Sequence, residues 1–246
     1  MIKELEDHNW FPAIFRRWQT EFVGNISVWT KLYKPLAPVL QQMIEENKVT
    51  VLHDTCSGSG VPAVYIHARL KTTMPMLLTD KYPDTAFENK PPVIYSLQPN
   101  DILAMQIVEN TLYTMYNAFH HFSEAQQKNI VKKMTEGKAP FLIAEILEPG
   151  WFNVLKIIFA TIIIQLITAP FVKPFSLVRL LFTYIIPVNL FTVTYDGIIS
   201  VLKSKTAAQY NELLKNISTQ NFTITINKIN NWKGNVVYIK GTPNNK

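Results

Sequence analysis

The sequence predicts an α/β fold: a Rossmann-like, doubly wound, seven-stranded and mostly parallel sheet with an antiparallel hairpin at one edge. Three observations predict it. Short apolar runs rich in β-branched residues alternate with helical segments over residues 49–146. The first of these runs ends in a glycine-rich turn that leads into a helix. Two late runs, 222–227 and 234–240, flank a short polar turn, as in a hairpin.

The N-terminal part is expected to be helical. Apolar residues recur at helical spacing in residues 10–47, first as an aromatic series from Trp10 to Phe22 and then from Leu36 to Ile44. Most of these aromatic side chains are expected to pack in the core. Residues 1–48 are therefore predicted to form an N-terminal helical cap.

The central sheet is expected within residues 49–146. Its strands are predicted at 49–53, 76–79, 93–95, 111–115 and 141–146, and its helices at 61–70 and 123–134. Pro62 is tolerated in the first turn of a helix, and Ser123 is a suitable N-cap. Residues 206–246, with a helix at 209–217 followed by the two late strands, are expected to complete the sheet.

Residues 147–205 interrupt this alternation and are predicted to form a hydrophobic helical insertion. Two stretches of 16 uncharged residues, 157–172 and 180–195, are both shorter than the roughly 20 residues of a spanning helix. Prolines interrupt or close them: Pro170, Pro174 and Pro187. A shallow membrane hairpin, an interfacial segment or a lid over an apolar pocket is favoured over two spans. A buried helical pair or a protein interface would leave the same pattern.

Composition narrows the class of protein. The chain has 246 residues, 48% of them hydrophobic and only 17% charged, against about a quarter in soluble domains. A disordered chain and a many-span channel are therefore excluded. The one cysteine, Cys56, cannot form an internal disulfide, which is typical of a reducing compartment. Residues 1–10 are charged and lack the apolar core of a signal peptide, so a cytoplasmic location is expected.

The charge balance favours a membrane surface over nucleic acid. The net charge is +6, but the basic residues are scattered, and no run is denser than Arg16-Arg17 or Lys132-Lys133. Nucleic-acid binding requires a clustered basic face, so no nucleic-acid partner is expected. Lys156, Lys173 and Arg179 border the apolar insertion and are positioned in the sequence to reach anionic head groups. A mildly basic soluble protein remains the alternative.

The glycine-rich turn is the strongest motif. The run Asp54-Thr55-Cys56-Ser57-Gly58-Ser59-Gly60 follows a strand and precedes a helix, so its backbone can approach a ligand closely. Asp80 ends the next strand, about 20 residues later, where an acidic residue binds ribose hydroxyls. Together these elements favour a nucleoside cofactor over the alternative of a tight turn and a capping aspartate.

Polar residues also follow the fourth predicted strand. Asn117 and His120 are the candidates for contact with a second substrate, and the ordinary pKa of histidine suits His120 as a general base. His121 is expected to be structural. Glu145 and Glu148 are expected to be structural or to position substrate. No metal site is expected, because adjacent histidines on one helix point in different directions.

Residues 49–146 resemble class I S-adenosylmethionine-dependent methyltransferases, and 222–242 resemble that fold's antiparallel strands six and seven. The segments 54–62, 78–83 and 117–122, with the patterns at 182–187 and 195–200, resemble more narrowly a bacterial group of poorly characterised methyltransferases with a hydrophobic insertion before the last strands.

The resemblance implies the cofactor S-adenosyl-L-methionine (SAM). It implies that residues 54–60 hold the methionine end and that Asp80 binds the ribose. Lys81, Tyr82, Asp101 and Ile102 would then surround the adenine. The chain departs from the family pattern at Cys56, where glycine is common. The implied cofactor-binding set is Asp54, Thr55, Cys56, Ser57, Gly58, Gly60, Asp80, Lys81, Tyr82, Asp101 and Ile102.

The sequence thus predicts a methyltransferase acting on a hydrophobic small molecule or lipid, associated with the membrane through residues 150–200. Asn117 and His120 are its tentative catalytic residues. The alternative is a membrane-associated interaction protein that has a methyltransferase-like fold without turnover.

Overall fold

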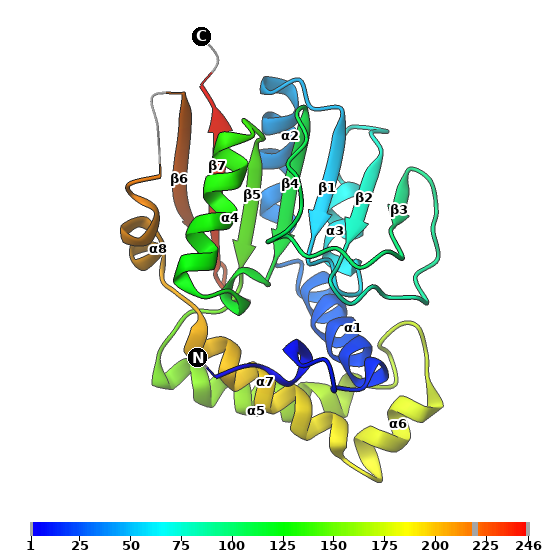
Figure 1. The fold of residues 1–246 in the computed structure, drawn as a ribbon. Coiled ribbons are helices and arrows are strands. Elements are labelled where there is room, and N and C mark those ends of the chain that lie inside the picture. Colours follow the sequence, from blue (N-terminus) through cyan, green and yellow to red (C-terminus); the bar gives the residue numbers. More distant parts are fainter. Residues whose placement is uncertain (1, 218–220, 245–246) are drawn as a thin grey trace.

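The computed structural model describes residues 2–217 and 221–244. Its centre is a seven-stranded sheet in the order β3-β2-β1-β4-β5-β7-β6 (Figure 1). The strands are β1 (Val51–Thr55), β2 (Met76–Thr79), β3 (Val93–Tyr95), β4 (Thr111–Tyr116), β5 (Phe141–Glu145), β6 (Phe222–Ile229) and β7 (Val236–Pro243). Strands β1 to β5 are parallel, whereas β7 runs antiparallel to both β5 and β6. The predicted fold class and the edge hairpin are confirmed.

Helices cover both faces of the sheet. On one face, α2 (Ala37–Glu46) and α3 (Val61–His67) pack against β1, β2 and β4. On the other, α4 (Glu124–Glu136) and α8 (Ala207–Leu214) pack against β4, β5 and β7. Ser123 caps α4 as predicted, because its hydroxyl accepts from the Gln126 amide while the Gln126 side chain binds the Ser123 amide. The sheet is therefore buried between two apolar layers.

A third layer lies beyond the carboxyl ends of the parallel strands (Figure 1). It contains α1 (Ala13–Thr30), α5 (Trp151–Thr168), α6 (Leu177–Tyr184) and α7 (Val188–Lys203). Two short 3-10 turns, η1 (Leu5–Asp7) and η3 (Phe119–His121), pack against α7, and η3 also packs against β5. Because polar residues at the carboxyl ends of a parallel sheet commonly form the ligand site, this layer covers the edge where a site is expected.

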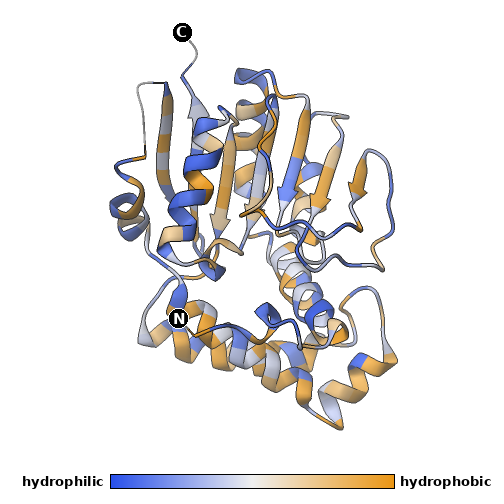
Figure 2. Ribbon diagram, in the orientation of Figure 1, coloured by the Kyte–Doolittle hydropathy of each residue, from blue (hydrophilic) through white to orange (hydrophobic). Residues whose placement is uncertain are grey.

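The insertion at 147–205 folds as α5, α6 and α7, and much of its surface is apolar (Figure 2). By length and composition α5 is able to cross a membrane, and α6 with α7, bent by 77°, passes the same test as a pair. Only 17% of the α5 window is buried in the protein. The hydrophobic side chains of this layer that are at least half exposed include Trp151, Phe152, Phe159, Ile163, Ile167, Phe171, Phe175, Leu177, Ile185 and Phe191.

Arg179 does not face outward from this insertion. Its side chain is buried, its Nη1 lies 2.7 Å from Glu21 Oε2, and its Nη2 donates to the Val172 and Pro174 carbonyls. The expectation that Arg179 reaches lipid head groups is therefore wrong. A buried guanidinium needs a carboxylate partner, and Glu21 of α1 supplies one. The ion pair ties α6 to α1.

Candidate functional site

A cavity of about 870 Å³ lies between the carboxyl ends of the strands and the third helical layer. Its sheet side is polar and includes the glycine-rich turn and the ends of β2 and β4. Its helical side includes the apolar residues Phe22, Val23 and Ile26 from α1, Ile164 from α5 and Val193 from α7, beside polar ones such as Gln19, Asp196 and Ser200. One cavity thus joins a polar compartment to an apolar one, and its size is that of a small-molecule site.

The glycine-rich turn uses conformations that favour glycine. Cys56, Gly58 and Gly60 have φ values of +54°, +50° and +70°. A Cβ on Gly60 would lie 2.8 Å from Leu78 Cδ1, and one on Gly58 would lie 3.0 Å from Thr20 Cγ2. Because Cys56 takes the same left-handed conformation, the structure explains why glycine suits its position.

Asp80 holds this turn. Its Oδ2 accepts from the Gly58 amide at 2.8 Å, and its Oδ1 accepts from the Tyr82 amide at 2.8 Å. Burial raises the pKa of the Asp80 carboxyl, although the two amides oppose that rise. Two backbone donors leave the second lone pair of each carboxylate oxygen open toward a ligand.

A second carboxylate follows β3. Asp101 Oδ1 accepts from the Leu103 amide at 3.0 Å, and its Oδ2 lies 3.4 Å from Lys81 Nζ. Tyr82 lies nearby, with its ring 4.0 Å from the Arg16 guanidinium carbon and its hydroxyl donating to Asn9. The structure brings Asp80 and Asp101 to the same cavity.

Most of the predicted site residues line this cavity. They are Cys56, Ser57, Gly58, Asp80, Lys81, Tyr82, Asp101, Ile102, Asn117 and His120. Asp54, Thr55 and Gly60 are not among the residues that line it. Asp54 is buried beneath the turn, where its Oδ1 accepts a 2.6 Å hydrogen bond from the Thr114 hydroxyl. The structure therefore places Asp54 as a support of the turn.

Glu148 also has a structural role. Its carboxylate pairs with Lys228 Nζ at 2.7 Å and accepts from the Asn235 side chain at 2.9 Å. It thereby links the start of the insertion to the β6–β7 hairpin.

The burial of Asp54 predicts a pH effect on stability. Burial raises the pKa of Asp54 from 3.8 to about 7, against the opposing hydrogen bonds of Thr114 and Ser57. Between these values the folded state keeps a proton that the unfolded state has lost, so this group lowers the unfolding free energy as the pH rises from about 4 to about 7. In Asp54→Asn, which cannot ionise, we expect that part of the decline to disappear.

Urea unfolding of both proteins at pH 4, 5.5, 7 and 8 measures this difference. Glu88→Gln, at an exposed carboxylate, is the matched control and should follow the parent curve. If Asp54→Asn shows the same pH dependence as the parent, the assignment of a neutral, buried Asp54 is wrong.

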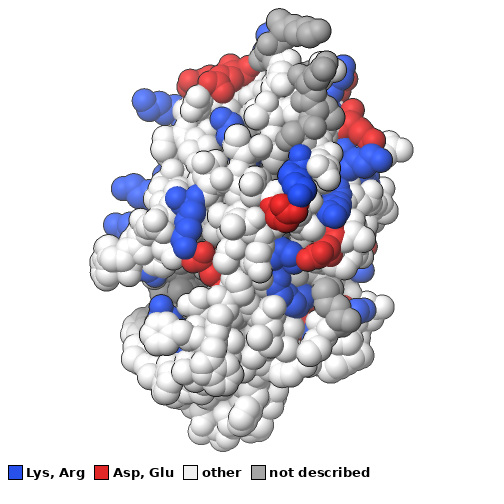
Figure 3. Space-filling model, turned by 90° about the vertical axis from the view of Figure 1, so that its left-hand side faces the viewer, with Lys and Arg blue, Asp and Glu red and all other residues white. Residues whose placement is uncertain are grey.

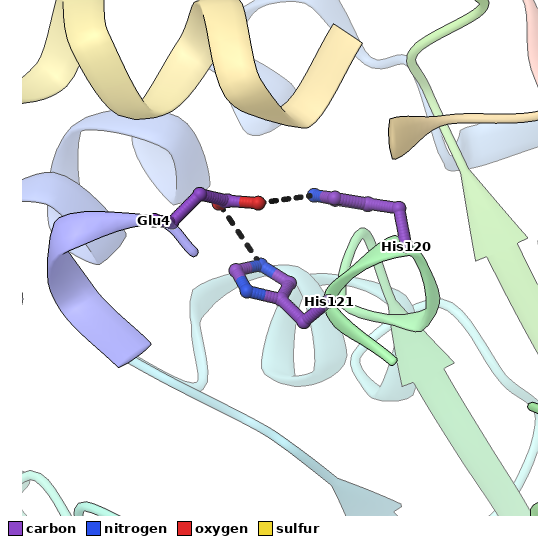
Figure 4. A group of neighbouring side chains, drawn as sticks. All are labelled: Glu4, His120 and His121. Atoms are coloured by element: carbon purple, nitrogen blue, oxygen red, sulfur yellow. Dashed lines mark ion pairs between the residues drawn. The ribbon is translucent and has the colours of Figure 1, made fainter. Parts of the chain in front are cut away.

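The turn η3 directs both of its histidines toward one carboxylate (Figure 4). His120 Nε2 lies 3.9 Å from Glu4 Oε1, and His121 Nε2 lies 3.4 Å from Glu4 Oε2. The two imidazole centroids are 4.5 Å apart. The expectation that the two side chains point in different directions is wrong, because on a single 3-10 turn the two neighbouring rings lie side by side, with their planes tilted by 34°.

Each imidazole is also held from its other side. His120 Nδ1 lies 2.6 Å from Glu145 Oε2, and the other Glu145 oxygen accepts from the Phe119 amide at 2.7 Å. His121 Nδ1 lies 3.0 Å from Asp7 Oδ1. Glu145 is therefore a structural partner of η3, which fixes the ring of His120.

The charges of this cluster shift several pKa values. Burial would lower the pKa of His121, but Glu4, Asp7 and Glu6 outweigh it and raise the pKa to about 10. Burial would raise the pKa of Glu4, but His121, His120 and Lys203 lower it overall. The surrounding carboxylates therefore favour the protonated form of His121.

Sequence reasoning missed the acidic side of this cluster. Glu4, Glu6 and Asp7 belong to no recognisable motif, and their partners lie far along the chain. The charged character of residues 1–10 is the available signal, but it does not indicate which residues these charges meet.

Comparison with protein-family models and with curated proteins gives no match. Among solved structures, the plantazolicin methyltransferase BpumL in complex with SAH is similar, with 10% identity, a TM-score of 0.50, and coverage of 94% of this chain and 88% of that one. Human N-acetylserotonin methyltransferase in complex with SAM is 12% identical, with a TM-score of 0.48 and coverage of 87% and 54%. This chain thus spans about half the length of the human structure. The likeness to BpumL confirms the fold, which is that of class I SAM-dependent methyltransferases.

Proposed function

We propose that the protein transfers a methyl group from SAM to a hydrophobic small molecule or lipid at the cytoplasmic face of a membrane. One observation carries this proposal: a single cavity joins the polar turn at Gly58 and Asp80 to an apolar lining from α1, α5 and α7. A polar cofactor and a lipophilic acceptor therefore have adjoining compartments.

The residues at the polar end fit the cofactor. A Cβ at Gly58 would lie 3.0 Å from Thr20 Cγ2, and the positive φ of this position favours glycine, so the backbone itself forms the floor of the site. Asp80 suits a ribose diol, while Asp101 and Ile102 suit the amino group and ring of adenine. When bound, SAM supplies an electrophilic methyl group on a sulfonium centre.

Asn117 and His120 are proposed to border the acceptor. Asn117 has a φ of +52°, its amide donates to the Ala144 carbonyl at 2.7 Å, and its side-chain oxygen accepts from Ile146. Its orientation is thus fixed at the carboxyl end of β4. Because proximity and in-line orientation of the reactants supply much of the acceleration in such transfers, these residues act mainly by placing the acceptor.

The outer surface of the insertion supports membrane contact. In Figure 3 the lowest part of the molecule, formed by the third helical layer, shows neither blue nor red on this face. Its exposed side chains include Phe159, Ile163, Phe171 and Phe175. Lys156 lies 4.6 Å from the Phe152 ring centroid, close to this surface. An apolar surface of this extent, rimmed by an amphipathic cation, suits a bilayer interface better than water.

Methyl transfer into lipid tests the proposed reaction. With SAM labelled in its methyl group and a bacterial lipid extract as the acceptor mixture, we expect label to move into the organic phase with the parent protein. Asp80→Asn should abolish that transfer. Binding of SAM without any transfer to lipid or small apolar acceptors would instead favour the interaction protein without turnover.

A further inference from the structure

We propose that Glu4, His120 and His121 form a binding site for one divalent transition-metal ion of the Zn²⁺ class. The three residues each offer a donor atom, and these atoms lie within 4.8 Å of one another (Figure 4). Two imidazole nitrogens and one carboxylate oxygen form a donor set typical of Zn²⁺ and unlike the all-oxygen sites of Mg²⁺. The proposal does not depend on methyl transfer.

The orientation of both imidazoles is the main argument. Each directs Nδ1 at a carboxylate, His120 at Glu145 (2.6 Å) and His121 at Asp7 (3.0 Å), and each directs Nε2 at Glu4. Metal-binding histidines typically donate one ring N–H to a carboxylate, which fixes the ring and strengthens the other nitrogen as a ligand. Two neighbouring rings held in this way point at a common centre.

His120 supplies an independent observation. Its side chain is fully buried, and within the described part of the chain no group forms a hydrogen bond with its Nε2. The nearest carboxylate oxygen, Glu4 Oε1, lies 3.9 Å away, beyond hydrogen-bonding distance. A buried ring nitrogen without a partner is costly, and a metal ion between it and Glu4 would satisfy it.

The surrounding charge also favours a cation. Besides Glu4, the carboxylates of Asp7 and Glu145 contact the two imidazoles. Asp196 accepts from the Leu5 and Glu6 amides at 2.6 and 3.2 Å and so fixes the segment that carries Glu4. The three proposed ligands all line the cavity, which leaves an open coordination position for water or a ligand oxygen.

Lys203 opposes metal binding and provides a sharp test. Its Nζ lies 3.0 Å from Glu4 Oε1, where its positive charge competes with a metal ion for the same oxygen. Lys203→Met should therefore tighten Zn²⁺ binding, by at least about tenfold. If these residues form only ion pairs with one another and bind no metal, Lys203→Met should show no increase in Zn²⁺ affinity.

The test titrates Zn²⁺ into the chelator-treated, full-length protein by calorimetry. We expect one site. His120→Gln and His121→Gln should abolish it, and Glu145→Gln should weaken it by about 10- to 100-fold. His8→Gln is the matched control and should bind as the parent does.

Absorption of the Co²⁺-loaded parent protein adds a readout that needs no variant. Visible bands without a thiolate charge-transfer band support the His/His/Glu set. No binding, a thiolate band from Cys56, or a site that persists unchanged in folded His120→Gln and His121→Gln proteins would overturn the proposal.

Discussion

Asp80→Asn is expected to lower the affinity for SAM and for SAH by at least about 100-fold while the chain stays folded. The carboxylate would accept two charge-assisted hydrogen bonds from a ribose diol, each contributing about 1.5–3 kcal/mol. It also accepts from the Gly58 and Tyr82 amides, at 2.8 Å each. Asparagine has one acceptor oxygen, so its NH₂ group would face either one of these amides or the ribose.

Calorimetric titration with each ligand measures the effect, and a thermal melt of each protein shows whether the fold is kept. Asp101→Asn should weaken binding less, because Asp101 is about one-third exposed and already pairs with Lys81. Glu88→Gln, far out on the surface, should bind as the parent does. Unchanged affinity in a folded Asp80→Asn protein would contradict the placement of the ribose at the end of β2.

The sheet could be predicted from the sequence because each strand carries its own signal. The runs at 76–79 and 93–95 match β2 and β3 residue for residue, since both are short, apolar and bounded by polar or proline-containing segments. Parallel strands place their carboxyl ends at one edge of the sheet, so the sequence alone predicts that Asp80, Asp101 and Asn117 lie close together. The motif thus located the polar end of the cavity.

Contacts between distant parts of the chain could not be predicted in this way. Glu4 meets His120, His121 and Lys203 only after the sheet and the third layer have formed, and none of these pairs has a characteristic spacing. Arg179 illustrates the same limit. Its place in an apolar segment suggested a lipid-facing cation, whereas Glu21, 158 residues away, holds it inside.

The position of Asp54 shows a different limit. The motif gives the order of residues along the turn, but not which side chains point toward the ligand. Strand β1 is central, and its last residues are buried on both sides. The Asp54 carboxyl therefore turns toward Thr114 of β4 and away from the cavity.

The double variant Phe159→Asp/Ile163→Asp is expected to lose membrane binding. These residues lie one helical turn apart on α5, are 63% and 51% exposed, and face away from the protein. Removing two such side chains from a bilayer interface costs about 1.5–3 kcal/mol each, before the cost of bringing two carboxylates to the lipid. The partition coefficient should therefore fall by roughly 100-fold or more.

Flotation with phosphatidylcholine vesicles, with and without phosphatidylglycerol, measures this change. Because the apolar side chains would carry the binding, the parent protein should float with both vesicle types and at high salt. Val108→Asp, at an exposed apolar residue just before β4 at the amino end of the sheet, is the matched control and should float as the parent does.

The same flotation experiment distinguishes membrane contact of the insertion from its alternative role as a lid. A lid over an apolar pocket needs its inner face, which Ile164 of α5 and Val193 of α7 contribute to the cavity, but it gains nothing from an apolar outer face. If the parent protein stays with the soluble fraction, the outer face of α5 does not dock on lipid. If the parent protein floats and the double variant does not, one helix, α5, both contacts the bilayer and lines the cavity. A lipid acceptor then has to cross only the thickness of this helical layer to reach the cavity.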